Sequence, residues 1–92
     1  MIRSFADKAT QALFEDRFVK AFAGFERQAR KKLLVLNAAS RLEDLKVPPG
    51  NRLEALTGNR SGQHSIRIND QWRVCFVWQD GHAEQVEILD YH

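Results

Sequence analysis

The sequence predicts an α+β domain in which a C-terminal antiparallel sheet is covered by an amphipathic helix. Residues 62–78 alternate apolar and polar side chains in two successive arms, and a third extended arm follows the turn signal Asp80-Gly81. Upstream, apolar residues recur at helical spacing between positions 22 and 36. Alternation with period two is typical of half-buried strands, and helical spacing of apolar residues indicates a helix with one buried side.

The two arms of residues 62–78 are predicted to form a hairpin. They meet at Asn69-Asp70, a step that tolerates the left-handed backbone of a tight turn. Arg67 and Arg73 fall on the polar face. The apolar face is made of His64, Ile66 and Ile68 in the first arm, and of Trp72, Val74, Phe76 and Trp78 in the second. With residues 82–92 as a third strand, the last thirty residues form a three-stranded antiparallel meander.

The elements before the hairpin are predicted from the spacing of apolar residues along the chain. Residues 2–5 are apolar at alternate positions and predict a short opening strand that adds an edge to the meander. A helical pattern runs from about 7 to 16, and a second, clearer helix ends near 37–39. Its apolar stripe is expected to cover the Trp72 face, and it consists of Phe22, Phe25, Ala29, Leu33 and Leu36.

The connection between the second helix and the hairpin is predicted from helix-capping residues and from prolines that interrupt regular structure. Residues 40–43 have the form of a capping box, with Ser40 and Glu43 as its ends, so a short helical turn should follow. The two prolines of residues 46–50 argue against regular structure there. A short extended or turn segment over 51–56 should then bury Leu53 and Leu56, and residues 57–62 read as a polar loop that carries Arg60.

Size and composition favour one small domain over residues 1–92. The chain has no apolar run long enough for a bilayer span and no apolar core of a secretory signal near its start. The single cysteine, Cys75, is expected to be a buried, inert thiol in a reducing cytoplasm. Net charge is +2, but residues 1–50 hold ten Lys/Arg against six Asp/Glu, whereas residues 51–92 hold four against six. This asymmetry suits either a polyanionic partner or a solvated helical face.

Several kinds of site lack a sequence signal. The three histidines show no paired spacing and there is one cysteine, so no metal site is expected. The glycines occur without a phosphate-binding pattern, and the serines lack the setting of a nucleophile elbow. No cofactor is therefore expected.

Two groups of residues remain as candidates for chemistry. Arg67 and Arg73 either pair with acidic neighbours across the sheet or form a phosphate-facing pair, because guanidinium groups match phosphate oxygens. The chain ends on Asp90-Tyr91-His92, which is either a frayed polar tail or an acid, a phenol and an imidazole suited to proton transfer. The tryptophans could stack on bases, although in a meander they are more often core residues.

These residues carry a family resemblance. The segment NRLEALTGNRSGQHSIRINDQWRVCF, the preceding PPG and the terminal VEILDYH resemble the HigB branch of the RelE-type toxins of bacterial type II toxin–antitoxin modules. The resemblance covers the whole chain and is strongest from Pro48 onward. It implies a RelE-like fold, with two N-terminal helices packed on a mostly antiparallel, twisted sheet of about four to five strands.

The resemblance also implies a function. Such toxins are metal-independent endoribonucleases that cleave mRNA in the ribosomal A site, through attack of the substrate's own 2′-hydroxyl on the adjacent phosphate. In that chemistry Arg73 neutralises charge on the scissile phosphate, and His92, with Asp90 and Tyr91, transfers protons. The remaining candidates for binding RNA or the ribosome are Arg67, Arg60, His64 and Asn69.

The implied partners are a HigA-type helix-turn-helix antitoxin, the ribosome and its mRNA, with operator DNA bound only through the antitoxin complex. No membrane partner is expected, and the implied location is the cytoplasm. Where some such toxins carry a histidine and a lysine, this chain has Glu54 and Thr57, so a carboxylate either replaces the imidazole as a base or is a surface acid. Two other readings stay open: a ParE-type inhibitor of DNA gyrase on the same fold, and a non-catalytic binding module.

Overall fold

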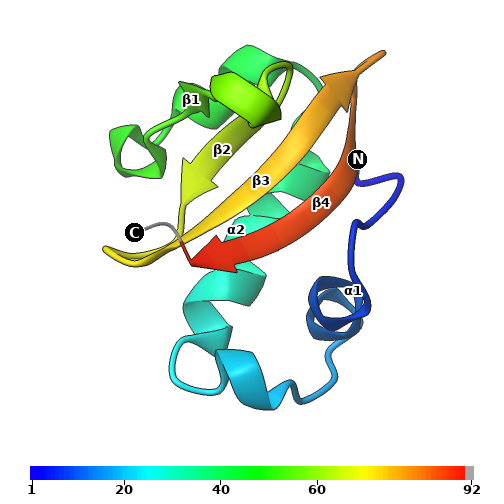
Figure 1. Cartoon of the computed structure of the whole chain (residues 1–92), viewed down its shortest axis with the longest axis vertical. Helices are drawn as coiled ribbons and strands as arrows, with labels where there is room; N and C mark the ends of the chain where they lie inside the picture. The colour runs from blue at the N-terminus through cyan, green and yellow to red at the C-terminus, as the bar shows by residue number, and fades with distance from the viewer. Residues whose placement is uncertain (91–92) are drawn as a thin grey trace.

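The structure, a computed structural model, describes residues 1–90 as two helices on one four-stranded antiparallel sheet (Figure 1). The sheet order is β1-β2-β3-β4, and every neighbouring pair is antiparallel. The strands are β1 (Glu54–Ala55), β2 (His64–Arg67), β3 (Trp72–Gln79) and β4 (His82–Asp90). The predicted α+β class and the three-stranded meander are confirmed, and β1 is added as a short edge strand.

Both hairpin turns form where the sequence predicts them. In the first, the Asn69 side-chain oxygen Oδ1 accepts hydrogen bonds from the backbone N–H groups of Gln71 and Trp72, each at 2.8 Å. In the second, Asp80 and Gly81 both have positive φ, at 54° and 79°. Two successive left-handed residues give the turn whose twist matches that of the flanking strands.

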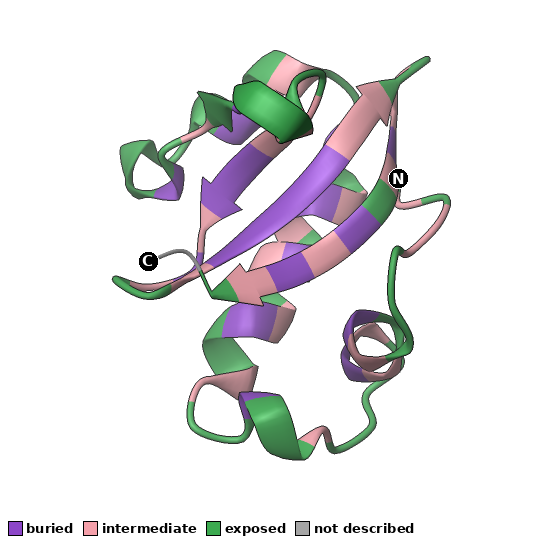
Figure 2. Ribbon diagram, in the orientation of Figure 1, coloured by how far each residue is buried: buried purple, intermediate pink, exposed green. Residues whose placement is uncertain are grey.

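Helix α2 (Glu26–Ala38) crosses behind the sheet and buries its apolar side against β2, β3 and β4 (Figures 1 and 2). The core joins residues of this helix to one face of the sheet: Ala29, Leu33 and Leu36 from α2, and Ile66, Val74, Phe76, Val86 and Ile88 from the strands. The predicted coverage of the sheet is confirmed. The helix begins at Glu26, after Phe22 and Phe25, and both rings still pack on Trp72, with centroids 5.9 and 4.7 Å away.

Helix α1 (Lys8–Phe14) lies beside β4, at the edge of the sheet (Figure 1). The Asp7 side chain caps it by accepting a hydrogen bond from the Thr10 backbone N–H at 3.0 Å. The buried Thr10 hydroxyl oxygen in turn accepts a bond from the Ile88 backbone N–H at 3.0 Å. The helix thus satisfies a donor on the edge strand β4.

The predicted opening strand does lie along β4, but as two isolated parallel bridges, Ile2 with Ala83 and Phe5 with Val86. Between them Gln85 has a φ of 53°, and its backbone N–H donates to the Ser4 hydroxyl at 2.9 Å. This irregularity in β4 interrupts the ladder, because a bulged residue leaves the regular pairing pattern.

The connection from α2 to the sheet differs from the prediction in two places. The acid that reaches back to the cap is Asp44 and not Glu43: its Oδ2 accepts from the backbone N–H groups of Ser40 and Arg41 at 3.1 and 3.0 Å. The prolines do not exclude regular structure either, since Pro49–Asn51 forms a 3₁₀ turn after the 3₁₀ helix Leu42–Lys46. Proline fits the first position of such a turn because that N–H has no partner to lose.

Within residues 1–90, no helix combines the length and the apolar character that crossing a membrane requires.

Candidate functional site

The two candidate arginines face each other on the side of the sheet that α2 leaves open. Arg67 on β2 is the direct register partner of Arg73 on β3, and Ser65 is the partner of Cys75 on the same face. Like charges directly opposite on neighbouring strands destabilise a sheet, so each needs an anionic or acceptor group close by. The predicted shared face is confirmed, and it carries both guanidinium groups.

Arg73 is held in a fixed position and is only 8% exposed. Its Nε donates to the Ser65 hydroxyl at 2.8 Å, and its Nη2 donates to the backbone carbonyl of Arg52 at 2.6 Å. Glu54 on β1 lies 3.9 Å from the same Nη2, at the outer limit of an ion pair. An acid across the sheet, one of the two alternatives predicted from the sequence, is therefore present, but its contact with the guanidinium is long. The shorter hydrogen bonds of the guanidinium go to the uncharged oxygens of Ser65 and Arg52.

Arg67 has a different environment. Its guanidinium pairs with Asp70 in the hairpin turn, and the Asp70 side chain is 97% exposed. An exposed ion pair of this kind contributes about 0–1 kcal/mol, because water screens both charges. A phosphate could therefore displace Asp70 from Arg67 at little energetic cost.

Arg60 lies on the same face but belongs to a tighter network. Its Nη1 contacts Glu87 on β4 at 2.8 Å and the side-chain oxygen of Gln63 at 3.0 Å. Burial raises the pKa of the nearby Cys75 thiol, an effect that the charge of Arg60 partly offsets. Cys75 is fully buried, which agrees with the predicted inert thiol.

His64 and Asn69 are not brought to the arginines. His64 is the register partner of Phe76 on the core face, where the two rings stack with centroids 6.3 Å apart. Asn69 closes the hairpin turn through the two backbone hydrogen bonds described above. Both residues have structural roles in the part of the chain that the structure describes.

Of the predicted C-terminal group, the structure describes Asp90 alone, and Tyr91 and His92 lie outside the described residues. Asp90 is the register partner of Trp72, so its side chain starts from the α2 side of the sheet rather than from the side of Arg73. Its carboxylate accepts a hydrogen bond from the Gln71 side chain at 2.9 Å. The last described residue of β4 thus ends beside the hairpin that carries both arginines.

Sequence reasoning missed the residues that fix Arg73. Ser65 and the carbonyl of Arg52 are its acceptors, and the neighbouring Asn51 is fully buried. Only Ser65 had a signal, since it alternates onto the polar face with Arg67. No group of three or more metal-ligating side chains converges anywhere in residues 1–90.

Comparisons with known proteins agree on one family. The profile of RelE-like toxins of the type II toxin–antitoxin system HigB matches residues 3–92. Toxin HigB-1 of Vibrio cholerae is 42% identical over 85 residues, which cover 90% of each chain. The protein named Endoribonuclease HigB from Proteus vulgaris is 28% identical and matches over 100% of both chains.

Solved structures give the same fold. A chain of the heterotetrameric YoeB-YefM toxin–antitoxin complex from Staphylococcus aureus superposes with a TM-score of 0.57 and 25% identity, over 100% of this chain and 98% of that one. YafQ from E. coli superposes with a TM-score of 0.61 over 98% of this chain and 93% of its own. At 11% identity, the second likeness shows the fold alone.

Proposed function

Because this chain belongs to the family of RelE-like HigB toxins of type II toxin–antitoxin systems, we propose that it is an endoribonuclease that cleaves mRNA bound to the ribosome. The name of the Proteus vulgaris relative supports the nuclease activity. The proposed reaction is attack of a substrate 2′-hydroxyl on the adjacent phosphate, which leaves a 2′,3′-cyclic phosphate and a free 5′-hydroxyl.

One observation carries this proposal: Arg73 is a rigidly held cation on the open face of the sheet, directly opposite a second arginine. In the transition state of this reaction, negative charge builds up on the non-bridging oxygens of the phosphate. A guanidinium whose position is fixed before the substrate arrives stabilises that charge without having to reorganise. The nucleophile comes from the RNA, so the protein needs to supply only charge, orientation and proton transfer.

Proton transfer is assigned to the C-terminal residues. His92 would accept the proton of the 2′-hydroxyl or protonate the leaving 5′-oxygen, with Asp90 and Tyr91 orienting it or the nucleotide. An imidazole has an ordinary pKa of about 6.5, so it can do either near neutral pH. The end of β4 supports this assignment, because the strand ends beside the hairpin of the arginines, although the Asp90 side chain starts from the α2 side of the sheet.

For substrate binding the geometry ranks the candidates. Arg67 is favoured, since its exposed partner Asp70 is easily displaced by a phosphate. Arg60 ranks lower, because Glu87 and Gln63 already engage its guanidinium. His64 and Asn69 are better explained by ring stacking and by the turn.

The proposed partners follow from the family. A HigA-type antitoxin would neutralise the toxin, and operator DNA would be bound through that complex. The proposed place of action is the cytoplasm, at the A site of the small ribosomal subunit. The basic helix α2, which carries Arg27, Arg30, Lys31 and Lys32, suits contact with ribosomal RNA.

The test is cleavage of a defined mRNA on purified ribosomes by wild type, Arg73→Ala and His92→Ala, with Lys8→Ala as a control for the loss of one positive charge. Lys8 begins α1, at the opposite edge of the sheet from β1. We expect wild type and Lys8→Ala to cut only when ribosomes are present, and the other two variants to lose about 10²-fold or more in rate. Intact mRNA with wild type would refute the proposal and would make gyrase inhibition the next assay.

A further inference from the structure

The segment before β1 makes a corner at residues 51 and 52 that connects the arginine site to the helix behind the sheet. Asn51 is fully buried, and its side-chain amide donates to the backbone carbonyls of Leu45 and Val47, both at 3.2 Å. Its side-chain oxygen accepts a hydrogen bond from the Lys32 ammonium on α2. Asn51 therefore ties this corner to the preceding loop and to α2.

The next residue, Arg52, has a left-handed backbone, with φ of 46° and ψ of 59°. This conformation is uncommon for a residue other than glycine, asparagine or aspartate, and it persists only where its surroundings hold it. Here the constraint comes from the buried Asn51 on one side and from Arg73 on the other, since Arg73 donates to the Arg52 carbonyl at 2.6 Å. Such enforced conformations cluster at functional sites.

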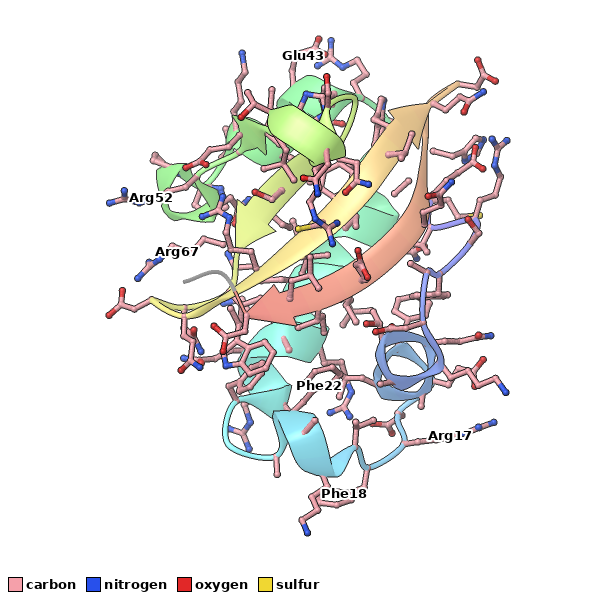
Figure 3. The ribbon with its side chains drawn as sticks, in the orientation of Figure 1. Arg17, Phe18, Phe22, Glu43, Arg52 and Arg67 are labelled. Atoms are coloured by element: carbon pink, nitrogen blue, oxygen red, sulfur yellow. The ribbon has the colours of Figure 1, made fainter. Side chains whose placement is uncertain are left out.

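The consequence of this backbone conformation is that the Arg52 side chain points into solvent. In Figure 3 the side chains of Arg52 and Arg67 both extend outward on the same side of the molecule. Arg52 is exposed, and within residues 1–90 its guanidinium forms no ion pair. The backbone of Arg52 and the strand position of Arg67 both adjoin Arg73, so the three arginines occupy one continuous region.

Lys32 adds positive charge beneath this region. Burial lowers the pKa of its ammonium, and the charges of Lys31 and Arg67 lower it further. The ammonium also donates to the side chain of Asn51, the neighbour of Arg52, so its charge lies at this corner. In the structure of residues 1–90, Arg73 pairs with Glu54 and Arg67 pairs with Asp70, and these two acids have side chains that are 53% and 97% exposed.

From these contacts we propose that Arg52 binds a phosphate of the mRNA next to the one that is cut, so that Arg52, Arg67 and Arg73 form a track for consecutive backbone phosphates. This inference rests on the proposed nuclease function. The chemistry is that of an RNA backbone: its charges recur at every nucleotide, and neighbouring guanidinium groups on a rigid frame match them. The hydrogen bond from Arg73 to the Arg52 carbonyl fixes the spacing between the catalytic arginine and the track.

The experiment compares wild type with Arg52→Ala, Arg52→Lys and the remote control Lys8→Ala. Arg52→Ala removes the guanidinium but keeps the carbonyl that holds Arg73. We expect it to raise the mRNA concentration needed for half-maximal cleavage about fivefold, the size expected for one exposed charge contact, with little change in the rate at saturation. Arg52→Lys should recover part of the loss, and Lys8→Ala should behave as wild type.

Neutral methylphosphonates, placed one at a time at each phosphate within two nucleotides of the cleavage site, identify the partner. If Arg52 contacts the mRNA, one of these substitutions weakens wild type but leaves Arg52→Ala unaffected. An Arg52→Ala defect that stays the same with every substituted substrate would mean that Arg52 contacts ribosomal RNA, and it would overturn the proposal. A variant indistinguishable from Lys8→Ala would overturn it as well.

A binding assay without cleavage separates this inference from the proposed function. The anisotropy of a labelled single-stranded RNA, measured over a range of salt concentrations, should give a slope of log affinity against log salt that falls by about 0.7 in Arg52→Ala, the value for one phosphate contact. If wild type binds RNA with this difference but never cuts mRNA on ribosomes, only the nuclease function fails. If Arg52→Ala has the slope of wild type, the track fails whatever the outcome of the cleavage assay.

Discussion

Replacing Ser65 by alanine tests how Arg73 is held. Ser65 is fully buried, and its hydroxyl accepts a hydrogen bond from Arg73 Nε at 2.8 Å. A buried hydrogen bond to a charged group is worth about 1.5–3 kcal/mol. We therefore expect Ser65→Ala to lower the free energy of unfolding by about 2 kcal/mol, or the melting temperature by roughly 8–16 °C for a domain of this size.

The decisive form of this experiment is a double-mutant cycle with Arg73→Met, followed by urea denaturation at pH 7. Methionine removes the charge and the donors but keeps much of the side-chain volume. If the cost of Ser65→Ala arises from an unsatisfied guanidinium, the same substitution in the Arg73→Met background should cost less than about 0.5 kcal/mol. Equal costs in both backgrounds would refute the argument, because the hydroxyl would then act through packing alone.

Three further predictions concern the groups around this site. Asn51→Ala should lower the free energy of unfolding by about 3 kcal/mol, because it removes a buried hydrogen bond to the Leu45 carbonyl and a partly buried one to the Val47 carbonyl, and urea denaturation measures this. Asp70→Asn should tighten single-stranded RNA binding about two- to fivefold by removing the competitor for Arg67, and weaker binding in an anisotropy titration would contradict it. Backbone hydrogen bonds from Arg41 and Ser40 hold the pKa of Asp44 below its ordinary value of 3.8. The stability that the ionised carboxylate contributes is therefore present above pH 3.8 and is lost as the pH falls through the folded-state pKa. Asp44→Asn should therefore be less stable than wild type at pH 7, and the difference in denaturation midpoints should shrink below pH 3.8.

The strands and turns of the meander could be predicted from the sequence because they depend on residues that are close together in the chain. Alternation set the faces of β2 and β3, and Asn69-Asp70 and Asp80-Gly81 set the turns that fix their register. Placing Arg67 and Arg73 on one face followed from the same alternation. The family resemblance supplied the roles of the C-terminal residues, and Tyr91 and His92 remain predictions because they lie outside the described residues.

The features that could not be predicted from the sequence depend on contacts between segments far apart in the chain. Arg52 adopts a left-handed backbone without being glycine, because Arg73, 21 residues later, bonds its carbonyl. Asn51 looked like an ordinary turn residue, but it is buried because Lys32 and two loop carbonyls satisfy its side chain. In β4, Gln85 forms an irregularity that lets Ala83 and Val86 both enter the core, which simple alternation forbids.

The acids beside the two opposed arginines explain how the free protein tolerates like charges in direct register. Two like charges in direct register weaken a small sheet, and the chain compensates with Glu54 near Arg73 and Asp70 beside Arg67. Both acids are at least half exposed, and both side chains sit at the margins of the site. They therefore reduce the repulsion in the absence of RNA from the margins of the site. On the proposed function, a bound phosphate relieves the remaining repulsion more fully than either carboxylate does, so the strain of the free state becomes part of the driving force for binding RNA.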